Sequence, residues 1–284
     1  MYKITIILIT IFVVIFNKSL IAKDLLIMSS IPDESITELH KKFLPLTNYL
    51  EKKIKMKIKF YPVTDYAAVV EGLAKNKIDL AWLGGFTYIQ AKIRSNNNVL
   101  PIIQREKDTR FTSVFISHKD NKVNSLEDLR KKSFSFGSPS STSGHLMPRS
   151  FLRKKNISPD FFFSRIAYSG AHDATIYSVL GKKVFAGVLN SLVWQKFLKE
   201  KPEIAKDLNV VFTTPEYYDY NWTIRKDVPK KIRRKLIQAF MDLNKYNNEH
   251  QKILNLQRAS FYLETKDENY QKIFEAARES KLIK

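Results

Sequence analysis

Three consecutive hydroxyl side chains stand at a turn in the middle of the sequence. Ser141, Thr142 and Ser143 follow a strand predicted over residues 133–136 and precede a helix predicted over about residues 144–153. Hydroxyl donors and free backbone N–H groups at the positive end of a helix form a site for an oxyanion, especially a phosphate-like group. Serine and threonine are also common helix caps. These residues alone therefore leave two interpretations open, an anion site and a simple cap.

The composition restricts the class of protein. The chain has 284 residues, of which 44% are hydrophobic and 27% charged, which suits one large or two medium-sized folded domains. There is no cysteine, and the five histidines show no metal-binding spacing. We therefore expect no disulfide, no metal site and no cofactor.

The chain is strongly basic, with a formal net charge of +20. Such a charge suits a nucleic acid, an anionic membrane or a small anion as partner, or reflects a general bias towards lysine. The sequence contains no aromatic–basic RNA motif and no zinc finger, so we expect no nucleic-acid partner.

The first 22 residues have the pattern of an export signal. Lys3 supplies a positive start, and residues 4–16 form an apolar run that is short for a membrane span. A polar region ending near Ala22 completes the pattern of a signal peptide over residues 1–22, which predicts a periplasmic protein. Leu20 is a poor residue for the cleavage site, so an uncleaved membrane anchor is the alternative.

Strands and helices are predicted to alternate along the rest of the chain, which is typical of α/β layers with mostly parallel sheets. Strands are predicted over residues 25–28, 56–61, 78–83, 99–104, 111–118, 133–136, 161–168, 184–189, 208–213 and 219–225. Helices are predicted over residues 36–52, 65–74, 87–93, 144–153, 170–180 and 191–199, with a short helical step at 126–129 and a mainly helical tail from about 230 to 281. We therefore expect two α/β units, with a ligand site at the carboxyl ends of their parallel strands.

Four stretches, taken in their order and spacing, resemble a known family. They read VTDYAAVVEGL at residues 63–73, IDLAWLG at 78–84, LEDL at 126–129 followed by STSG at 141–144 and Pro148, and GAHDA at 170–174. With these stretches the chain resembles the phosphonate/phosphite/phosphate-binding periplasmic proteins of ABC importers over nearly its whole length after the leader.

The resemblance implies a two-lobed, type II periplasmic binding protein with its ligand cleft between two α/β domains. We expect residues 23–116 plus 212–284 to form lobe 1 and residues 117–211 to form lobe 2. The family's function implies a monomeric solute-binding protein that delivers its ligand to an ABC permease in the inner membrane and is not an enzyme.

The resemblance also implies which residues contact the ligand. Ser141, Thr142 and Ser143 match the family's phosphonyl-binding loop, and His172 matches a histidine that contacts the anion. The residues expected opposite them are Tyr66, Phe111 and Asp219. The secondary candidates are Trp82, Gly84, Asn190 and Trp222, and the two tryptophans could either wall the pocket or pack in the core.

One departure from the family narrows the expected ligand. Relatives that bind aminoalkylphosphonates hold the amine with two carboxylates, but the stretch that should supply one contains Asn190 and no acid, and Phe185 replaces a common Asp. A single acid, Asp219, suits an anion that presents a P–OH group. We therefore expect phosphite, methylphosphonate or phosphate. The alternatives are a binder of larger phosphonates such as aminoethylphosphonate, a secreted enzyme or a receptor input domain.

Overall fold

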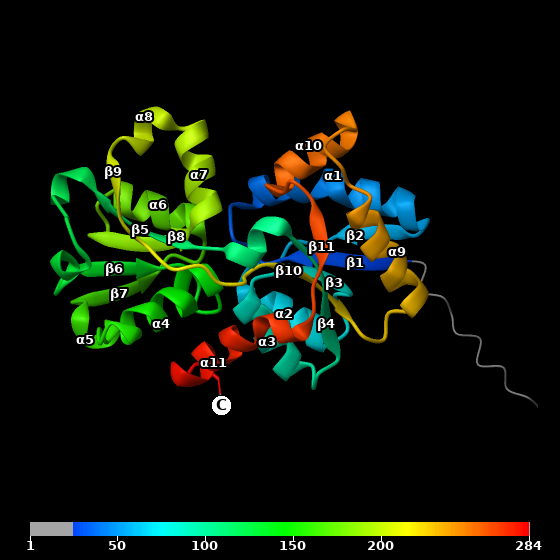
Figure 1. Cartoon of the computed structure of the whole chain (residues 1–284), viewed down its shortest axis with the longest axis horizontal. Helices are drawn as coiled ribbons and strands as arrows, with labels where there is room; N and C mark the ends of the chain where they lie inside the picture. The colour runs from blue at the N-terminus through cyan, green and yellow to red at the C-terminus, as the bar shows by residue number, and fades with distance from the viewer. Residues whose placement is uncertain (1–24, 284) are drawn as a thin grey trace, which may run out of the picture.

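The computed structural model describes residues 25–283, and within this range the chain forms two α/β lobes that lie side by side (Figure 1). The predicted leader, residues 1–22, lies outside the described residues. The two lobes are built on separate sheets, which have six and five strands in the described part of the chain. The predicted fold class, two α/β units facing each other, is confirmed.

Lobe 1 carries the six-stranded sheet, with strand order β11-β4-β10-β3-β1-β2. Strand β1 pairs in parallel with β2 and β3, whereas β10 is antiparallel to β3 and β4, and β11 is antiparallel to β4. The strands are β1 (Leu25–Ser30), β2 (Lys57–Phe60), β3 (Leu80–Leu83), β4 (Val99–Arg105), β10 (Asn221–Arg225) and β11 (Tyr262–Glu264). The helices are α1 (Ile36–Ile54), α2 (Tyr66–Ala74), α3 (Gly85–Arg94), α9 (Lys230–Met241), α10 (Asn248–Gln257) and α11 (Gln271–Glu279).

Alternating polarity explains how these elements are oriented. In β2 the side chains of Ile58 and Phe60 are buried while those of Lys57 and Lys59 are exposed, as the period of two in a strand requires. Helix α1 begins after Ser35, whose hydroxyl caps it, and buries a stripe of apolar residues against the sheet. Sequence periodicity was therefore enough to predict this lobe's layers.

Lobe 2 carries the five-stranded sheet, with strand order β7-β6-β8-β5-β9. Strand β6 is parallel to β7 and β8, and β5 is antiparallel to β8 and β9. The strands are β5 (Ser113–His118), β6 (Ser133–Phe136), β7 (Arg165–Tyr168), β8 (Ala186–Asn190) and β9 (Leu208–Thr213). The helices are α4 (Met147–Lys154), α5 (Pro159–Phe162), α6 (His172–Leu180), α7 (Ser191–Glu200) and α8 (Pro202–Ala205).

The chain crosses between the lobes in two segments that pair with each other. One lies between β4 and β5 and the other between β9 and β10, and they are joined where Phe111 and Tyr217 exchange backbone hydrogen bonds of 2.8 and 2.9 Å. The expected division at 116/117 and 211/212 falls inside β5 and β9, which both belong to the sheet of lobe 2. We therefore place the division at the crossing segments, just before Ser113 and just after Thr213.

Three predicted elements differ from the structure. The strand predicted over 161–168 is only β7, because Pro159 starts the short helix α5, which includes Phe161 and Phe162. The helix predicted from residue 144 starts instead as a π-helical turn, Thr142–Leu146, which leads into α4. The helical tail contains β11, whose register against β4 is set by tertiary contacts.

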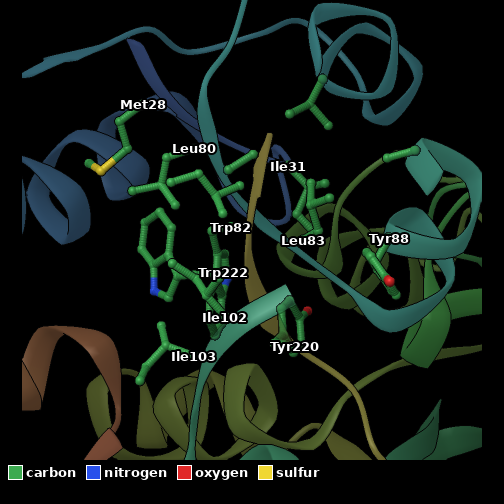
Figure 2. Close-up of a cluster of buried hydrophobic side chains, with 14 of the residues drawn as sticks. Met28, Ile31, Leu80, Trp82, Leu83, Tyr88, Ile102, Ile103, Tyr220 and Trp222 are labelled. Atoms are coloured by element: carbon green, nitrogen blue, oxygen red, sulfur yellow. The ribbon is translucent and has the colours of Figure 1, made fainter. Parts of the chain in front are cut away.

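The hydrophobic core of lobe 1 surrounds two tryptophans. Figure 2 shows Trp82 of β3 and Trp222 of β10 packed among apolar side chains of the same sheet, with Tyr220 at their edge. The ring centroids of Trp82 and Trp222 are 5.5 Å apart, and Trp82 stacks on Tyr220 at 5.1 Å. The core therefore extends to the crossing segment that carries Tyr220. Among residues 25–283, no helix is both long and apolar enough to cross a membrane.

Candidate functional site

The loop after β6 makes contacts within lobe 2 and across to lobe 1. Ser141 caps the π-helical turn, because its Oγ accepts a hydrogen bond from the Gly144 backbone N–H at 2.9 Å. Thr142 Oγ1 instead accepts the backbone N–H of Phe86 in lobe 1, also at 2.9 Å. Exposure is 2% for Ser141 and Thr142 and 1% for Ser143. The loop therefore has both roles, because the Ser141 hydroxyl caps the helical turn and the Thr142 hydroxyl contacts the opposite lobe.

Asp219 faces this loop from the second crossing segment, with one carboxylate oxygen unpaired. Its Oδ1 accepts the backbone N–H of Gly85 at 3.1 Å, while its Oδ2 is buried without a hydrogen-bond partner among the described residues. Burial raises the pKa of Asp219 to about 7, although the Gly85 N–H and the Thr142 hydroxyl oppose the rise. Near neutral pH this carboxyl can therefore either donate or accept a hydrogen bond.

His172 is the first residue of α6 and joins both lobes. Its backbone N–H donates to the carbonyl of Asp33 in lobe 1 at 2.9 Å, and its ring Nε2 lies 3.2 Å from the Tyr220 hydroxyl. Burial lowers the pKa of His172 to about 4, so its imidazole is neutral at physiological pH. Asn190, at the end of β8, donates through Nδ2 to the same Tyr220 hydroxyl at 2.8 Å.

Tyr66 approaches the loop from the start of α2. Its side chain is buried, and its hydroxyl has no hydrogen-bond partner in the described part of the chain, although Ser141 is close enough to influence its pKa. That pKa is held well above its usual value, mainly by burial. The Tyr66 O–H is therefore a buried donor without an acceptor, which is uncommon in folded proteins and points to a missing partner.

Aromatic rings form one wall beside these polar groups. Phe111 contacts Tyr220 edge-on with a centroid distance of 5.4 Å, and Trp82 covers the opposite side of that ring. Behind them, the buried Arg105 guanidinium lies 4.7 Å from the Trp82 centroid and 5.3 Å from that of Tyr220. Trp222 lies a layer deeper, against Trp82, so it supports the wall and does not form its surface.

The fold explains why these residues meet. Except for Asp219, which lies on the second crossing segment, the polar candidates lie just past, or at, the carboxyl end of a parallel strand, where layered α/β proteins place their ligands. In chain order they are Tyr66 after β2, Gly84 after β3, Ser141–Ser143 after β6, His172 after β7 and Asn190 at the end of β8. Tyr220 was not predicted. Its only signal was its place in the run Tyr217–Tyr218–Asp219–Tyr220 beside a candidate acid.

The two lobes are in direct contact around the site. The Ser35 N–H of lobe 1 donates to Asp173 Oδ2 of lobe 2 at 2.9 Å, and Thr87 Oγ1 donates to the Ser140 carbonyl at 3.0 Å. Residues 25–283 contain no group of three or more His, Cys, Asp or Glu side chains arranged to hold a metal ion.

Two α/β lobes joined by paired crossing segments, with buried polar groups from both lobes meeting between them, define a two-lobed ligand-binding protein. Residues 28–270 match the model of one such family, described as ABC transporter, phosphonate, periplasmic substrate-binding protein. The chain belongs to this family of transport proteins, as the sequence stretches implied.

Individual relatives agree with the family. The chain is 33% identical over 268 residues to a probable ABC transporter phosphite-binding protein, PhnD1, of Prochlorococcus marinus, covering 90% of each chain. It is 30% identical over 224 residues to the phosphonates-binding periplasmic protein of Escherichia coli, covering 77% of this chain and 66% of the relative. The structure of P. marinus PhnD1 in complex with methylphosphonate superposes with a TM-score of 0.88 and 32% identity, covering 92% of this chain and 99% of the relative.

Proposed function

We propose that this protein captures a small phosphorus oxyanion, namely phosphite, methylphosphonate or phosphate, between its lobes and delivers it to an ABC permease of the inner membrane. It works in the periplasm as a monomer, after export directed by residues 1–22, and it binds its ligand reversibly without a cofactor or a chemical step. The phosphite-binding name and the methylphosphonate complex of the P. marinus relative support this choice of ligand class.

The observation that carries the proposal is the pair of unsatisfied polar atoms beside the hydroxyl loop. Tyr66 Oη and Asp219 Oδ2 are both buried and lack partners among residues 25–283. An oxyanion between them would accept the Tyr66 O–H, and a P–OH group would donate to Asp219 when the carboxyl is ionised. The ligand would thus complete the hydrogen bonding that the protein leaves open.

The loop binds the phosphorus–oxygen group that all three candidate ligands have in common. Ser141, Thr142 and Ser143 supply hydroxyls and backbone N–H groups, and the neutral His172 adds a ring contact. Hydrogen bonds to charged groups contribute about 1.5–3 kcal/mol each, so roughly six cover the ~8–12 kcal/mol of micromolar to nanomolar binding after association costs. No lysine or arginine is needed in direct contact with the anion.

A small ligand fits the charges better than an aminoalkylphosphonate does. Asn190 has an amide in place of a carboxylate, and its Nδ2 already donates a hydrogen bond to the Tyr220 hydroxyl. Another buried carboxylate, Asp33, already has Lys42 as a counter-ion at 3.7 Å. Asp33 Oδ1 is also buried without a hydrogen-bond partner among the described residues, but Lys42 offsets the charge of that carboxylate. Of these two acids, Asp219 is the one without an ion pair to a described residue, and a single acid holds an ammonium group poorly.

The test is a titration of the purified protein with phosphite, methylphosphonate, phosphate and aminoethylphosphonate by isothermal calorimetry. We expect at least one of the first three to bind with micromolar or tighter affinity and aminoethylphosphonate to bind more weakly. Binding no tighter than millimolar by all four contradicts the proposal. A new phosphorus NMR signal on prolonged incubation would indicate an enzyme instead.

The role of the loop is tested by Thr142→Val, which keeps the shape of the side chain and removes its hydroxyl. The matched control is Ser164→Ala, because Ser164 is an exposed residue of lobe 2 outside the cluster. Loss of about 1–3 kcal/mol predicts a five- to 150-fold weaker affinity for Thr142→Val. Equal affinities for the two variants would reduce the loop to a structural turn.

A further inference from the structure

A second polar cavity lies between the lobes, apart from the residues of the ligand site. It has a volume of about 510 Å³ and is lined by residues of α7 of lobe 2 and of the helices α1 and α10 of lobe 1. Figure 1 shows α7 and α10 in its upper part. Its lining is rich in cations, contributed by both lobes. They are Lys41, Lys42, Lys107 and Arg258 of lobe 1 and Lys196 and Lys199 of lobe 2.

The cavity carries a surplus of positive charge. Its lining includes six cationic side chains and two carboxylates, Glu38 and Glu200. Carboxylates offset three of these cations: Lys196 is paired with Glu34, Glu38 and Glu200, Arg258 with Glu34, and Lys42 with Asp33. The surplus is therefore that of the exposed rim. The remaining exposed lysines of the rim, Lys41, Lys107 and Lys199, make no ion pair with another described residue. The rim therefore attracts anions into the groove where the two lobes meet.

Lys42 is a buried lining residue of this cavity, and its ammonium is compensated by an ion pair with Asp33 and by the rings of Phe43 and Trp82. It is 4% exposed, its Nζ makes no hydrogen bond to a described residue, and its nearest carboxylate oxygen, Asp33 Oδ2, is 3.7 Å away. Burial lowers the pKa of Lys42 to about 8, and the charges of Arg258 and Arg105 act in the same direction, whereas Asp33 and Glu34 oppose the shift. A buried ammonium with free N–H donors in the lining of a basic cavity is suited to an oxyanion.

The cavity is separated from the ligand site by a single layer of residues. Lys42 Nζ lies 5.7 Å from the ring centroid of Trp82, which stacks on the Tyr220 ring of the site wall. Asp33 forms a second link, because its carboxylate faces Lys42 while its carbonyl accepts the backbone N–H of His172. An anion held over Lys42 would therefore be next to the cleft.

We propose that this cavity is an outer anion site, which holds the transported oxyanion weakly over Lys42 before the cleft admits it. The inference rests on the proposed function and adds a second, weaker binding position on the route of the same ligand. The lysine rim collects the anion from solution, and the anion offsets the repulsion between the cations of the two lobes as they approach. The outer site therefore raises the association rate more than it raises the final affinity.

The test compares association rates of methylphosphonate measured by stopped-flow tryptophan fluorescence. One variant carries Lys41→Gln, Lys107→Gln and Lys199→Gln, which removes the exposed rim. The control variant carries Lys57→Gln, Lys122→Gln and Lys281→Gln, which removes the same net charge from exposed positions away from the cavity. Both sets change surface residues, and thermal melting checks that both variants fold.

We expect the rim variant to associate about five- to twentyfold more slowly than the control at about 10 mM ionic strength, within the range of electrostatic steering. The difference shrinks to under about twofold at 1 M salt, where the Debye length is roughly 3 Å. Dissociation rates stay within about twofold of each other, because steering acts mainly on the association rate.

Other outcomes overturn the outer site in distinguishable ways. Equal association rates for the two variants refute it while leaving the proposed function intact. Absence of methylphosphonate, phosphite and phosphate binding by the unmodified protein removes the proposed function and the outer site together. Normal association with impaired uptake by the assembled transporter would make this surface a permease contact instead and refute its role as an anion site.

Discussion

Gly84 lies at a close contact between the two lobes. It precedes α3 at the end of β3, with a φ of −74° that alanine adopts without strain. A Cβ added there would lie 2.7 Å from Thr142 Oγ1 and 3.2 Å from Asp219 Oδ1. Since Thr142 belongs to lobe 2, the substitution Gly84→Ala obstructs contact between the lobes and leaves lobe 1 itself unchanged.

The size of the effect follows from that overlap. Forcing an extra methyl group into a packed contact costs about 1–3 kcal/mol. If the whole cost falls on the closed form, the dissociation constant rises about five- to 150-fold. The loss of the glycine at the N-cap of α3 changes helix stability by no more than about 1 kcal/mol, so the ligand-free protein should melt within a few degrees of the unmodified protein.

The assay is calorimetric titration with the tightest phosphorus oxyanion, alongside melting of the ligand-free protein. Gly181→Ala is the control, because Gly181 ends α6 away from the cleft and its added Cβ would meet only the Tyr177 carbonyl, at 3.1 Å. In a Thr142→Ala background the obstructing oxygen is gone, so adding Gly84→Ala should cost little further affinity. Unchanged affinity of the single variant, or an equal loss in both backgrounds, would refute the reasoning.

Three further predictions follow from the buried charges. Burial raises the pKa of Asp219 to about 7, above the value of about 3.9 for an exposed carboxyl, so closing would take up a proton where opening of the lobes exposes this group. Affinity should therefore fall as pH rises from about 4 to 7 and level off above 7, and Asp219→Asn should remove that component when calorimetric pH profiles of the two proteins are compared. Lys196→Met removes an ion pair of 2.9 Å to Glu34 in the opposite lobe. The pKa of Glu34 is held well below its usual range by surrounding cations in spite of burial, so this carboxylate is charged and loses a partner. We expect ligand dissociation measured by stopped-flow to become about three- to thirtyfold faster, and unchanged dissociation would contradict a role of this ion pair in closure. Arg105→Met leaves Asp108 buried without its bidentate partner, now at 2.8 and 2.6 Å, and should cost about 3–5 kcal/mol of unfolding free energy in denaturant titrations, a loss that Asp108→Asn in the same chain should reduce.

Much of this protein could be predicted from local patterns. The periods of 2 in β2 and 3.6 in α1 reflect which side chains face the core, so they could be read without knowing the partners of either element. The order of strands and helices then predicted two α/β layers, and the carboxyl ends of their parallel strands brought Ser141, His172 and Tyr66 to one place.

Other features depend on neighbours in space and leave no local pattern. Strand β11 forms in a tail that otherwise reads as helix, because β4 offers it an unpaired edge. Trp222 lies in the core behind Trp82. The two residues are paired on the neighbouring strands β10 and β3, and their rings are in contact, so only Trp82 contributes to the wall of the site. Tyr220 joins the polar cluster through Asn190 and His172, two residues from other elements.

The loop of Ser141, Thr142 and Ser143 has some properties that the sequence predicts and others that depend on the tertiary structure. The sequence by itself determined that Ser141 could cap a helix start and that three hydroxyls would stand at a strand end, because both depend on neighbours along the chain. Only the tertiary structure decided that Thr142 reaches the Phe86 N–H of the opposite lobe, that Asp219 keeps one oxygen unpaired and that Lys42 is buried in the lining of a basic cavity. Such properties depend on burial and on distances between residues far apart in the chain, so no local pattern records them.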